Sequence, residues 1–157
     1  IATTLSKDFQ IKIIGAGSAH FKLKNCILKN NNVELISPVE RKELKKHYQE
    51  ADVLFLHLND LNAFKRVLPS KIFEYVATGI PIVAGLSGYS ASFLKENVPH
   101  ALIFNPGDAR GASNCILDST NIKVSKKNVN AFVTKYSRES IMNNFSSLIL
   151  VAANENI

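Results

Sequence analysis

The sequence predicts an α/β fold, namely a Rossmann-like parallel sheet with helices on both faces and a helical C-terminal tail. Five short apolar runs rich in β-branched residues recur along the chain, and their starts lie about 20 to 30 residues apart, which leaves room for one helix each time. Most residues within the runs are apolar, as is typical of parallel strands that are covered on both faces. The predicted strands cover residues 11–15, 33–36, 52–56, 80–84 and 101–104.

Helices are predicted in the intervals between these strands. They lie near residues 18–30, 40–50, 70–78 and 89–97. From about residue 111 the chain has no clear strand, and two sets of apolar residues indicate one or two amphipathic helices. The sets are Val129, Phe132, Val133 and Tyr136, and then Ile141, Phe145, Leu148 and Ile149. We therefore predict a single domain over residues 1–157, with an α/β core in 1–110 and a helical tail in 111–157.

The most informative segment is 68–85, LPSKIFEYVATGIPIVAG, which predicts a loop, a short helix, a glycine stop and a buried strand. Ser70 is the expected N-cap, because a serine hydroxyl can accept a hydrogen bond from an unpaired N–H group of the first turn. Gly79 followed by Pro81 ends the helix, since glycine adopts the left-handed cap and proline cannot continue a helix. The residues expected to face the core are Ile72, Phe73, Val76 and Ala77.

The opposite face of this helix is polar. Lys71, Glu74 and Thr78 are three and four positions apart, so they share one side. A cation and a carboxylate beside free backbone N–H groups suit a ligand that carries both phosphates and hydroxyls. The alternative is an ordinary surface ion pair between Lys71 and Glu74.

Further candidates follow from the rule that ligands of such sheets bind outside the carboxyl ends of the strands. Gly15 and Gly17 follow the first strand, and Ser87 and Gly88 follow the fourth, so these loops are candidates for a phosphate or a sugar. A tight turn is the favoured alternative for Gly15 and Gly17, and a turn with capping serines is an equal alternative for Ser87 and Gly88. His57 ends the third strand and either faces substrate or has a structural role, and the sequence favours the structural role.

Composition and charge narrow the class of protein. Apolar residues make up 46% and charged residues 20% of the chain, as in ordinary globular proteins, and no apolar run is long enough to span a membrane. The net charge of +6 fits a phosphate-bearing ligand or an anionic membrane surface. The basic residues are scattered without aromatic partners, which argues against a nucleic-acid partner.

Three smaller features carry local predictions. Cys26 and Cys115 lie in apolar stretches and are expected to be reduced core thiols, as in a cytoplasmic protein. Asp108 is expected to cap the helix that follows it. The chain begins at Ile1, so we expect it to be either processed or part of a longer protein.

The segment PSKIFEYVATGIPIVAG resembles the donor-binding segment in the C-terminal half of GT-B glycosyltransferases of family GT4. The likeness is greatest to the WbuB-like transferases of bacterial O-antigen and capsule assembly. It extends from about residue 8 to about residue 146 and includes, in order, IKIIGAGSAHFKLK, NNVELISPVERKELKKHYQEADVLFLHL, ALIFNPGDARG and KYSRESIMNNF.

The resemblance implies roles for individual residues. Glu74 matches the glutamate that binds the donor ribose, and Lys71, supported by Ser70, would offset the charge of the diphosphate. Ser37 and Pro38 occupy the loop where backbone groups hold the nucleotide base, although a strand-to-helix turn is an equal alternative. The sequence departs from the family at Arg66, eight positions before Glu74, where many members carry the first of two glutamates, which contacts the donor sugar. No catalytic residue is therefore assigned.

The resemblance also implies a reaction. The parent enzyme would be a retaining glycosyltransferase that moves a sugar, expected to be N-acetylated, from a UDP donor to a lipid-linked saccharide acceptor in the synthesis of lipopolysaccharide or capsule. It would work in the cytoplasm, at the inner face of the cell membrane, and GT-B enzymes generally need no bound metal and no cofactor besides the UDP-sugar. The acceptor would be held by an N-terminal domain that this chain lacks, so the chain alone should be inactive.

Two alternatives stay open at this point. One is the donor half of a GT-B-fold UDP-sugar epimerase, which would use paired acids and histidines in its cleft. The other is a stand-alone nucleotide-binding module of the flavodoxin-like kind, for which a cluster of acids at the strand ends would be expected.

Overall fold

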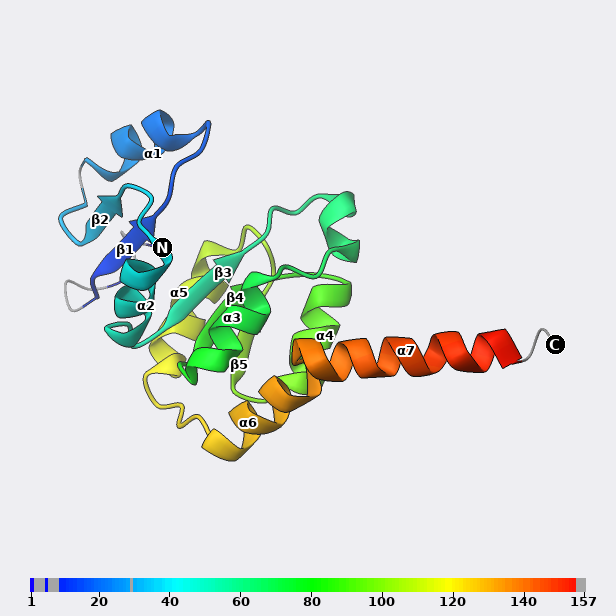
Figure 1. Cartoon of the computed structure of the whole chain (residues 1–157). Helices are drawn as coiled ribbons and strands as arrows, with labels where there is room; N and C mark the ends of the chain where they lie inside the picture. The colour runs from blue at the N-terminus through cyan, green and yellow to red at the C-terminus, as the bar shows by residue number, and fades with distance from the viewer. Residues whose placement is uncertain (2–4, 6–8, 29, 155–157) are drawn as a thin grey trace.

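The computed structural model describes residues 1, 5, 9–28 and 30–154, and in this part strands and helices alternate as predicted (Figure 1). The first part contains β1 (Ile11–Ile14), α1 (His20–Ile27), β2 (Val33–Ile36), α2 (Arg41–Gln49), β3 (Leu54–His57), α3 (Lys71–Thr78), β4 (Ile82–Gly85), α4 (Tyr89–Asn97) and β5 (Ala101–Phe104). A short 3-10 helix, η1 (Asn62–Arg66), precedes α3 and was not predicted. The last part is helical, with α5 (Ala109–Ser119), α6 (Lys126–Lys135) and α7 (Arg138–Asn154).

All strand pairs of the described residues are parallel, which confirms the predicted α/β class, but the five strands described there form two sheets rather than one. β1 pairs with β2, and β3, β4 and β5 pair in that order. No ladder joins the two sheets among the described residues. The central strand β4 is buried along its whole length, whereas the residues of β1 and β2 are half-buried or exposed. The smaller sheet therefore lacks the apolar enclosure that stabilises the larger one.

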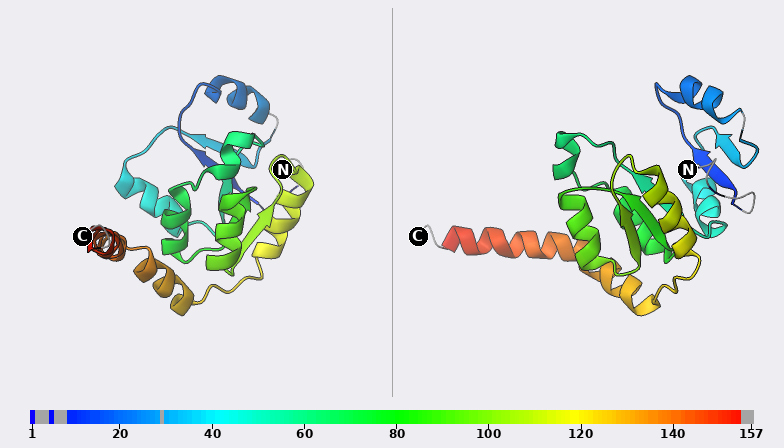
Figure 2. Two further views of the ribbon diagram at one scale, coloured as in Figure 1. Left: turned by 90° about the vertical axis from the view of Figure 1, so that its right-hand side faces the viewer. Right: turned by 180° about the vertical axis from the view of Figure 1, so that it is seen from behind.

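The larger sheet is covered on both faces, as the apolar runs predicted. Successive side chains of β4 point to opposite faces, so Ile82 and Ala84 join one core cluster and Val83 joins another. The first cluster is closed by side chains of α3, α4 and α6, and the second by side chains of α5. The ribbons of these helices lie around the larger sheet in Figure 2. This arrangement fixes α3, the helix with the polar face, against the sheet.

The α3 helix ends as predicted but packs slightly differently. Gly79 adopts the left-handed conformation at φ 72°, which confirms it as the stop. Ile72 and Val76 are each only 1% exposed. Ala77, in contrast, is exposed, and Tyr75 packs against the core instead, which corrects the predicted apolar stripe. The long side chain of Tyr75 reaches the core from the side of the helix, whereas the methyl group of Ala77 is too short to do so.

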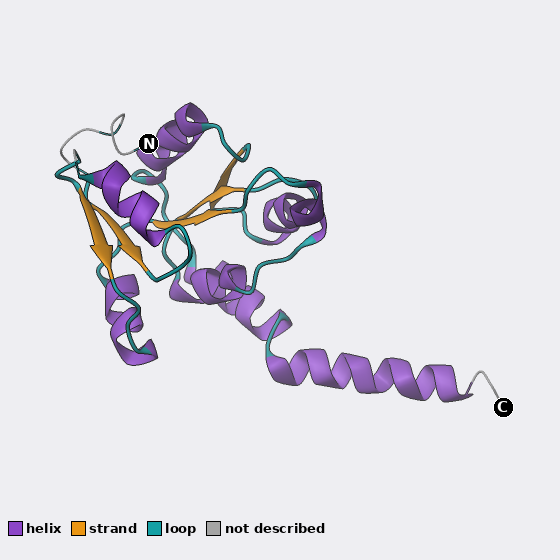
Figure 3. Ribbon diagram, turned by 90° about the horizontal axis from the view of Figure 1, so that it is seen from above, coloured by secondary structure: helices purple, strands orange, loops and turns teal. Residues whose placement is uncertain are grey.

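The C-terminal helices differ in how they pack. Phe132 of α6 is buried in the first cluster, which ties this helix to α3 and α4. The α7 helix extends away from the rest of the chain (Figures 1 and 3), and its apolar residues, from Ile141 to Val151, are exposed. The helix is confirmed, although its apolar stripe does not pack against the described part of the chain. Over the same described part, no helix is long and apolar enough to cross a membrane.

Two of the local predictions can be checked directly. The Asp108 carboxylate accepts a hydrogen bond from the Gly111 N–H at 2.8 Å, so it caps α5 as predicted. Cys115 packs against the second cluster, and burial raises the pKa of its thiol. Cys26 is exposed on α1, so its assignment as a core thiol is wrong. No residue of α1 is buried, so the apolar neighbours of Cys26 in the sequence do not enclose it.

The burial of His100, just before β5, leads to a prediction of how the stability of the fold depends on pH. Its side chain is buried, and neither ring nitrogen has a hydrogen-bond partner among the described residues. Burial lowers the pKa of His100 below its ordinary value, so the unfolded chain binds a proton at a pH where the folded chain does not. Stability from this residue is complete above the unfolded pKa of about 6.5 and decreases as pH falls below it.

We therefore expect the free energy of unfolding in urea to fall between pH 8.0 and pH 5.5, and to fall less in His100→Leu. Leucine fills a similar apolar volume and does not titrate. An equal loss in both proteins would show that His100 is not the group responsible.

Candidate functional site

The loops after β1 and β2 lie side by side. Ile14 is in register with Ile36, and the Gly15 N–H donates to the Ile36 carbonyl at 3.0 Å, so Gly15 and Ser37 are neighbours. Gly15 has a φ of 149°, which side chains rarely adopt, and no atom lies within 4 Å of the place where a Cβ would stand at Gly15 or Gly17. Ser37 and Pro38 are exposed. These loops are therefore open to a ligand.

The loop after β4 lies on the other sheet and is more crowded. Gly88 has a φ of 65°, and a Cβ there would collide with the backbone carbonyl of Lys65 in η1. The Ser87 carbonyl accepts a hydrogen bond from the Ser90 hydroxyl at 3.4 Å. The backbone conformation and the close contact with Lys65 explain why position 88 is a glycine, without any role in ligand binding.

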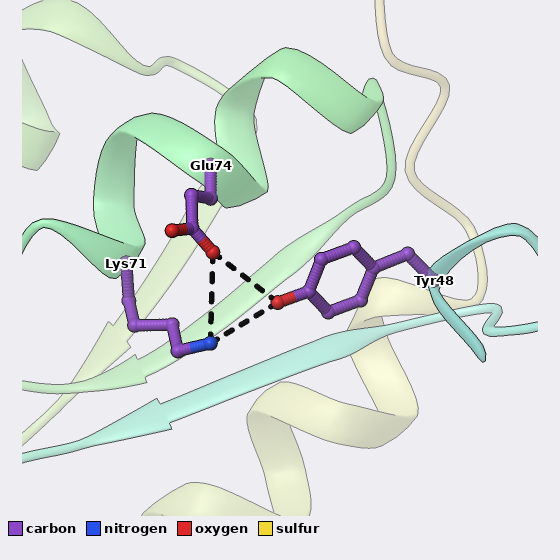
Figure 4. Close-up of polar contacts among 3 residues, drawn as sticks. All are labelled: Tyr48, Lys71 and Glu74. Atoms are coloured by element: carbon purple, nitrogen blue, oxygen red, sulfur yellow. Dashed lines mark hydrogen bonds and ion pairs between the residues drawn. The ribbon is translucent and has the colours of Figure 1, made fainter. Parts of the chain in front are cut away.

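Lys71 and Glu74 meet on the first turn of α3, as their spacing predicted. The Lys71 Nζ lies 3.6 Å from a Glu74 carboxylate oxygen. Figure 4 shows a third member that the sequence did not indicate, Tyr48 of α2. Its hydroxyl accepts from Lys71 at 3.1 Å and donates to Glu74 at 3.4 Å. No motif spacing connects Tyr48 with α3, because the contact forms only when the helices pack.

Aromatic rings surround the cation of this cluster. The Lys71 Nζ lies 5.9 Å from the centre of the Tyr48 ring and 5.8 Å from that of Tyr75, within reach of cation–π attraction. Partial burial acts to lower the pKa of Lys71, but the hydrogen bond to Tyr48 and the electrostatic influence of Tyr48, Tyr75 and Glu74 outweigh it and raise this pKa. Burial also raises the pKa of the Tyr75 hydroxyl. The lysine is therefore fully charged and still half exposed to solvent.

Two polar residues at the ends of α3 do not act as expected. The Ser70 side chain makes no capping hydrogen bond, because its backbone is already helical and a side-chain cap needs an extended conformation there. The N–H groups of Ile72 and Phe73 instead donate to the carbonyls of Pro69 and Ser70. The Thr78 hydroxyl is used at the other end of the helix, where it bonds to the Tyr75 carbonyl and the Ile80 N–H.

These findings change the expected source of attraction for an anion. Free N–H groups at the helix start contribute less than the sequence suggested, since two of them are satisfied locally. At the start of α3, the positive charge of Lys71 would therefore attract a phosphate more than the backbone N–H groups would.

His57 has a structural role, as favoured from the sequence. Its Nε2 accepts a hydrogen bond from the Gly107 N–H at 3.1 Å. Its ring stacks on Phe104 at a centroid distance of 6.0 Å. His57 thereby holds the loop after β5 against the end of β3.

The sequence-predicted residues thus form separate groups. The structure brings Lys71 together with Glu74, and Gly15 together with Ser37, while Ser87 and Gly88 lie by η1. The hydrogen bonds and ion pairs of the described residues do not join these groups. Within that same part of the chain, no group of three or more His, Cys, Asp or Glu side chains could hold a metal ion. The groups that a ligand could meet at α3 are the Lys71 ammonium, the Glu74 carboxylate and the Tyr48 hydroxyl.

Comparison with known proteins identifies the family of this chain. The family model for glycosyl transferases group 1 matches residues 1–121, which include all five strands and the helices α1 to α5. A search of curated proteins found no match. Because the family match covers most of the chain, the protein belongs to the group 1 (GT4) glycosyl transferases.

Proposed function

We propose that this chain is the nucleotide-sugar-binding domain of a retaining glycosyltransferase and that α3 binds the donor. The observation that carries the proposal is the exposed Lys71–Glu74 pair on the first turn of α3. A UDP-sugar presents ribose hydroxyls, which donate to a carboxylate, and a diphosphate, which pairs with a cation. The Glu74 carboxylate and the Lys71 ammonium supply both partners on one helix face.

The open loops after β1 and β2 complete the proposed donor site. Gly15 and Gly17 leave room for a ligand close to the backbone, and the loop that contains Ser37 and Pro38 offers backbone groups for the nucleotide base. The closed environment of Gly88 makes Ser87 and Gly88 the weakest members of the proposed set.

The proposed reaction moves a sugar, N-acetylated in our view, from UDP to a lipid-linked saccharide during the synthesis of a bacterial surface polysaccharide. We place it at the inner face of the cell membrane, where the basic surface of the chain favours contact with anionic lipids. The acceptor would be held by a second Rossmann-like domain, and transfer would take place in the cleft between the two. One wall of a cleft neither orients an acceptor nor excludes water from the reacting centre.

The isolated chain should therefore bind UDP yet transfer no sugar. Calorimetric titration with UDP tests the first part, and incubation with UDP-N-acetylhexosamines and a polyprenyl-diphosphate saccharide tests the second. Absence of UDP binding would refute the donor-site proposal. Turnover at rates typical of enzymes, about 1 per second or more, would instead refute the need for a second domain.

A further inference from the structure

One hydroxyl group connects the two charged side chains of the α3 cluster. Tyr48 is 23 residues before Lys71 and 26 before Glu74, and its oxygen accepts from the first and donates to the second (Figure 4). The two hydrogen bonds run in one direction, since the ammonium donates to the phenol oxygen and the phenol donates to the carboxylate. Each bond therefore polarises the other. Both charged groups are therefore held by a partner outside their own helix.

Such a partner matters because the Lys71–Glu74 pair is weak by itself. The two side chains are 45% and 48% exposed, and an exposed ion pair at this spacing contributes little against the rotamer freedom of two long side chains. Without a third contact, both would sample several rotamers, and a ligand would have to order them on binding.

Tyr48 itself is held rigidly enough to serve this purpose. Its ring meets the Tyr75 ring edge-on, with 5.6 Å between centroids and an interplanar angle of 79°. Tyr75 in turn packs against the first core cluster. The phenol oxygen is thus connected to the core through two stiff aromatic side chains, each with only two rotatable bonds.

We propose that Tyr48 is a positioning residue of the donor site, whose hydroxyl fixes the Lys71 ammonium and the Glu74 carboxylate in the arrangement that the nucleotide meets. The inference rests on the proposed function. It adds a residue from α2 to a site otherwise built on α3 and the loops after β1 and β2. The raised pKa of Lys71, to which the hydrogen bond to Tyr48 contributes, is in keeping with this role.

The test is Tyr48→Phe, which removes the hydroxyl and keeps the ring contacts with Tyr75 and Lys71. We expect a three- to tenfold loss of UDP affinity in calorimetric titration, about the worth of one hydrogen bond that orders charged groups. Tyr136→Phe is the matched control. Its hydroxyl donates to Asn97 Oδ1 at 2.8 Å, away from α2, so the same chemical change there should leave UDP affinity as in the wild type.

A second measurement distinguishes positioning from a general effect on stability and needs no ligand. Titration of the Lys71 ammonium by NMR, with its signal assigned from Lys71→Arg, should give a lower pKa in Tyr48→Phe than in the wild type or in Tyr136→Phe. If the wild type binds UDP, and Tyr48→Phe has the same UDP affinity and the same Lys71 pKa as the wild type, the inference about Tyr48 is overturned and the proposed function is not affected. A wild type without affinity for UDP would refute the proposed function instead, and the Lys71 pKa would still decide whether Tyr48 holds the lysine.

Discussion

Glu74→Gln should weaken UDP binding about tenfold or more. Hydrogen bonds from ribose hydroxyls to a carboxylate are charge-assisted and each contributes about 1.5 kcal/mol or more, and 1.4 kcal/mol corresponds to a factor of ten in affinity. Glutamine keeps the shape of the side chain but loses the charge and one acceptor. Calorimetric titration of UDP into the two proteins measures the effect.

The fold of Glu74→Gln should barely change, because Glu74 is exposed and its ion pair with Lys71 is of the weak surface kind. Glu96→Gln is a suitable control, since Glu96 is an exposed carboxylate on α4 and the charge change is identical. If Glu74→Gln and Glu96→Gln both bind UDP as the wild type does, Glu74 is only a surface residue and the site loses its strongest support.

Lys71→Ala should weaken UDP binding about ten- to a hundredfold, since a hydrogen bond between charged groups contributes roughly 1.5–3 kcal/mol. Uridine, which lacks the diphosphate, should lose much less. The difference between UDP and uridine therefore separates the role of Lys71 from that of Glu74, whose partners are present in both ligands.

Lys95→Ala controls for the general loss of positive charge, since Lys95 lies on α4, away from the proposed site. Equal losses for UDP and uridine in Lys71→Ala would mean that Lys71 acts through the local structure of α3 and not through the phosphates.

The positions of the elements could be predicted from the sequence because they depend on local patterns. Each apolar run became a strand, and Gly79 and Asp108 end and begin helices through contacts within a few residues of themselves. The split into two sheets could not be predicted, since pairing between β1 and β3 depends on packing across the whole domain. The exposure of the apolar residues of α7 could not be predicted either. A helical period in the sequence indicates an apolar face of the helix but not whether another element covers that face.

The candidate site was predictable only where its members share one element. Lys71 and Glu74 are three positions apart on one helix, so their meeting followed from helical geometry. Tyr48 reaches them from α2, and no spacing in a single sequence reveals such a contact. Ser70 failed as a cap because Pro69 begins a turn one residue earlier, so that the backbone at Ser70 is already helical.

The central claim is that the donor nucleotide lies over the first turn of α3 and the loops after β1 and β2. NMR titration of the isotope-labelled chain with UDP tests this claim most directly, because every backbone amide reports on nearby binding. We expect the largest shift changes at the amides of residues 70–74, 15–18, 37, 39 and 40, with small changes on α5 and α7. Changes centred on other elements, or none at saturating UDP, would contradict the claim.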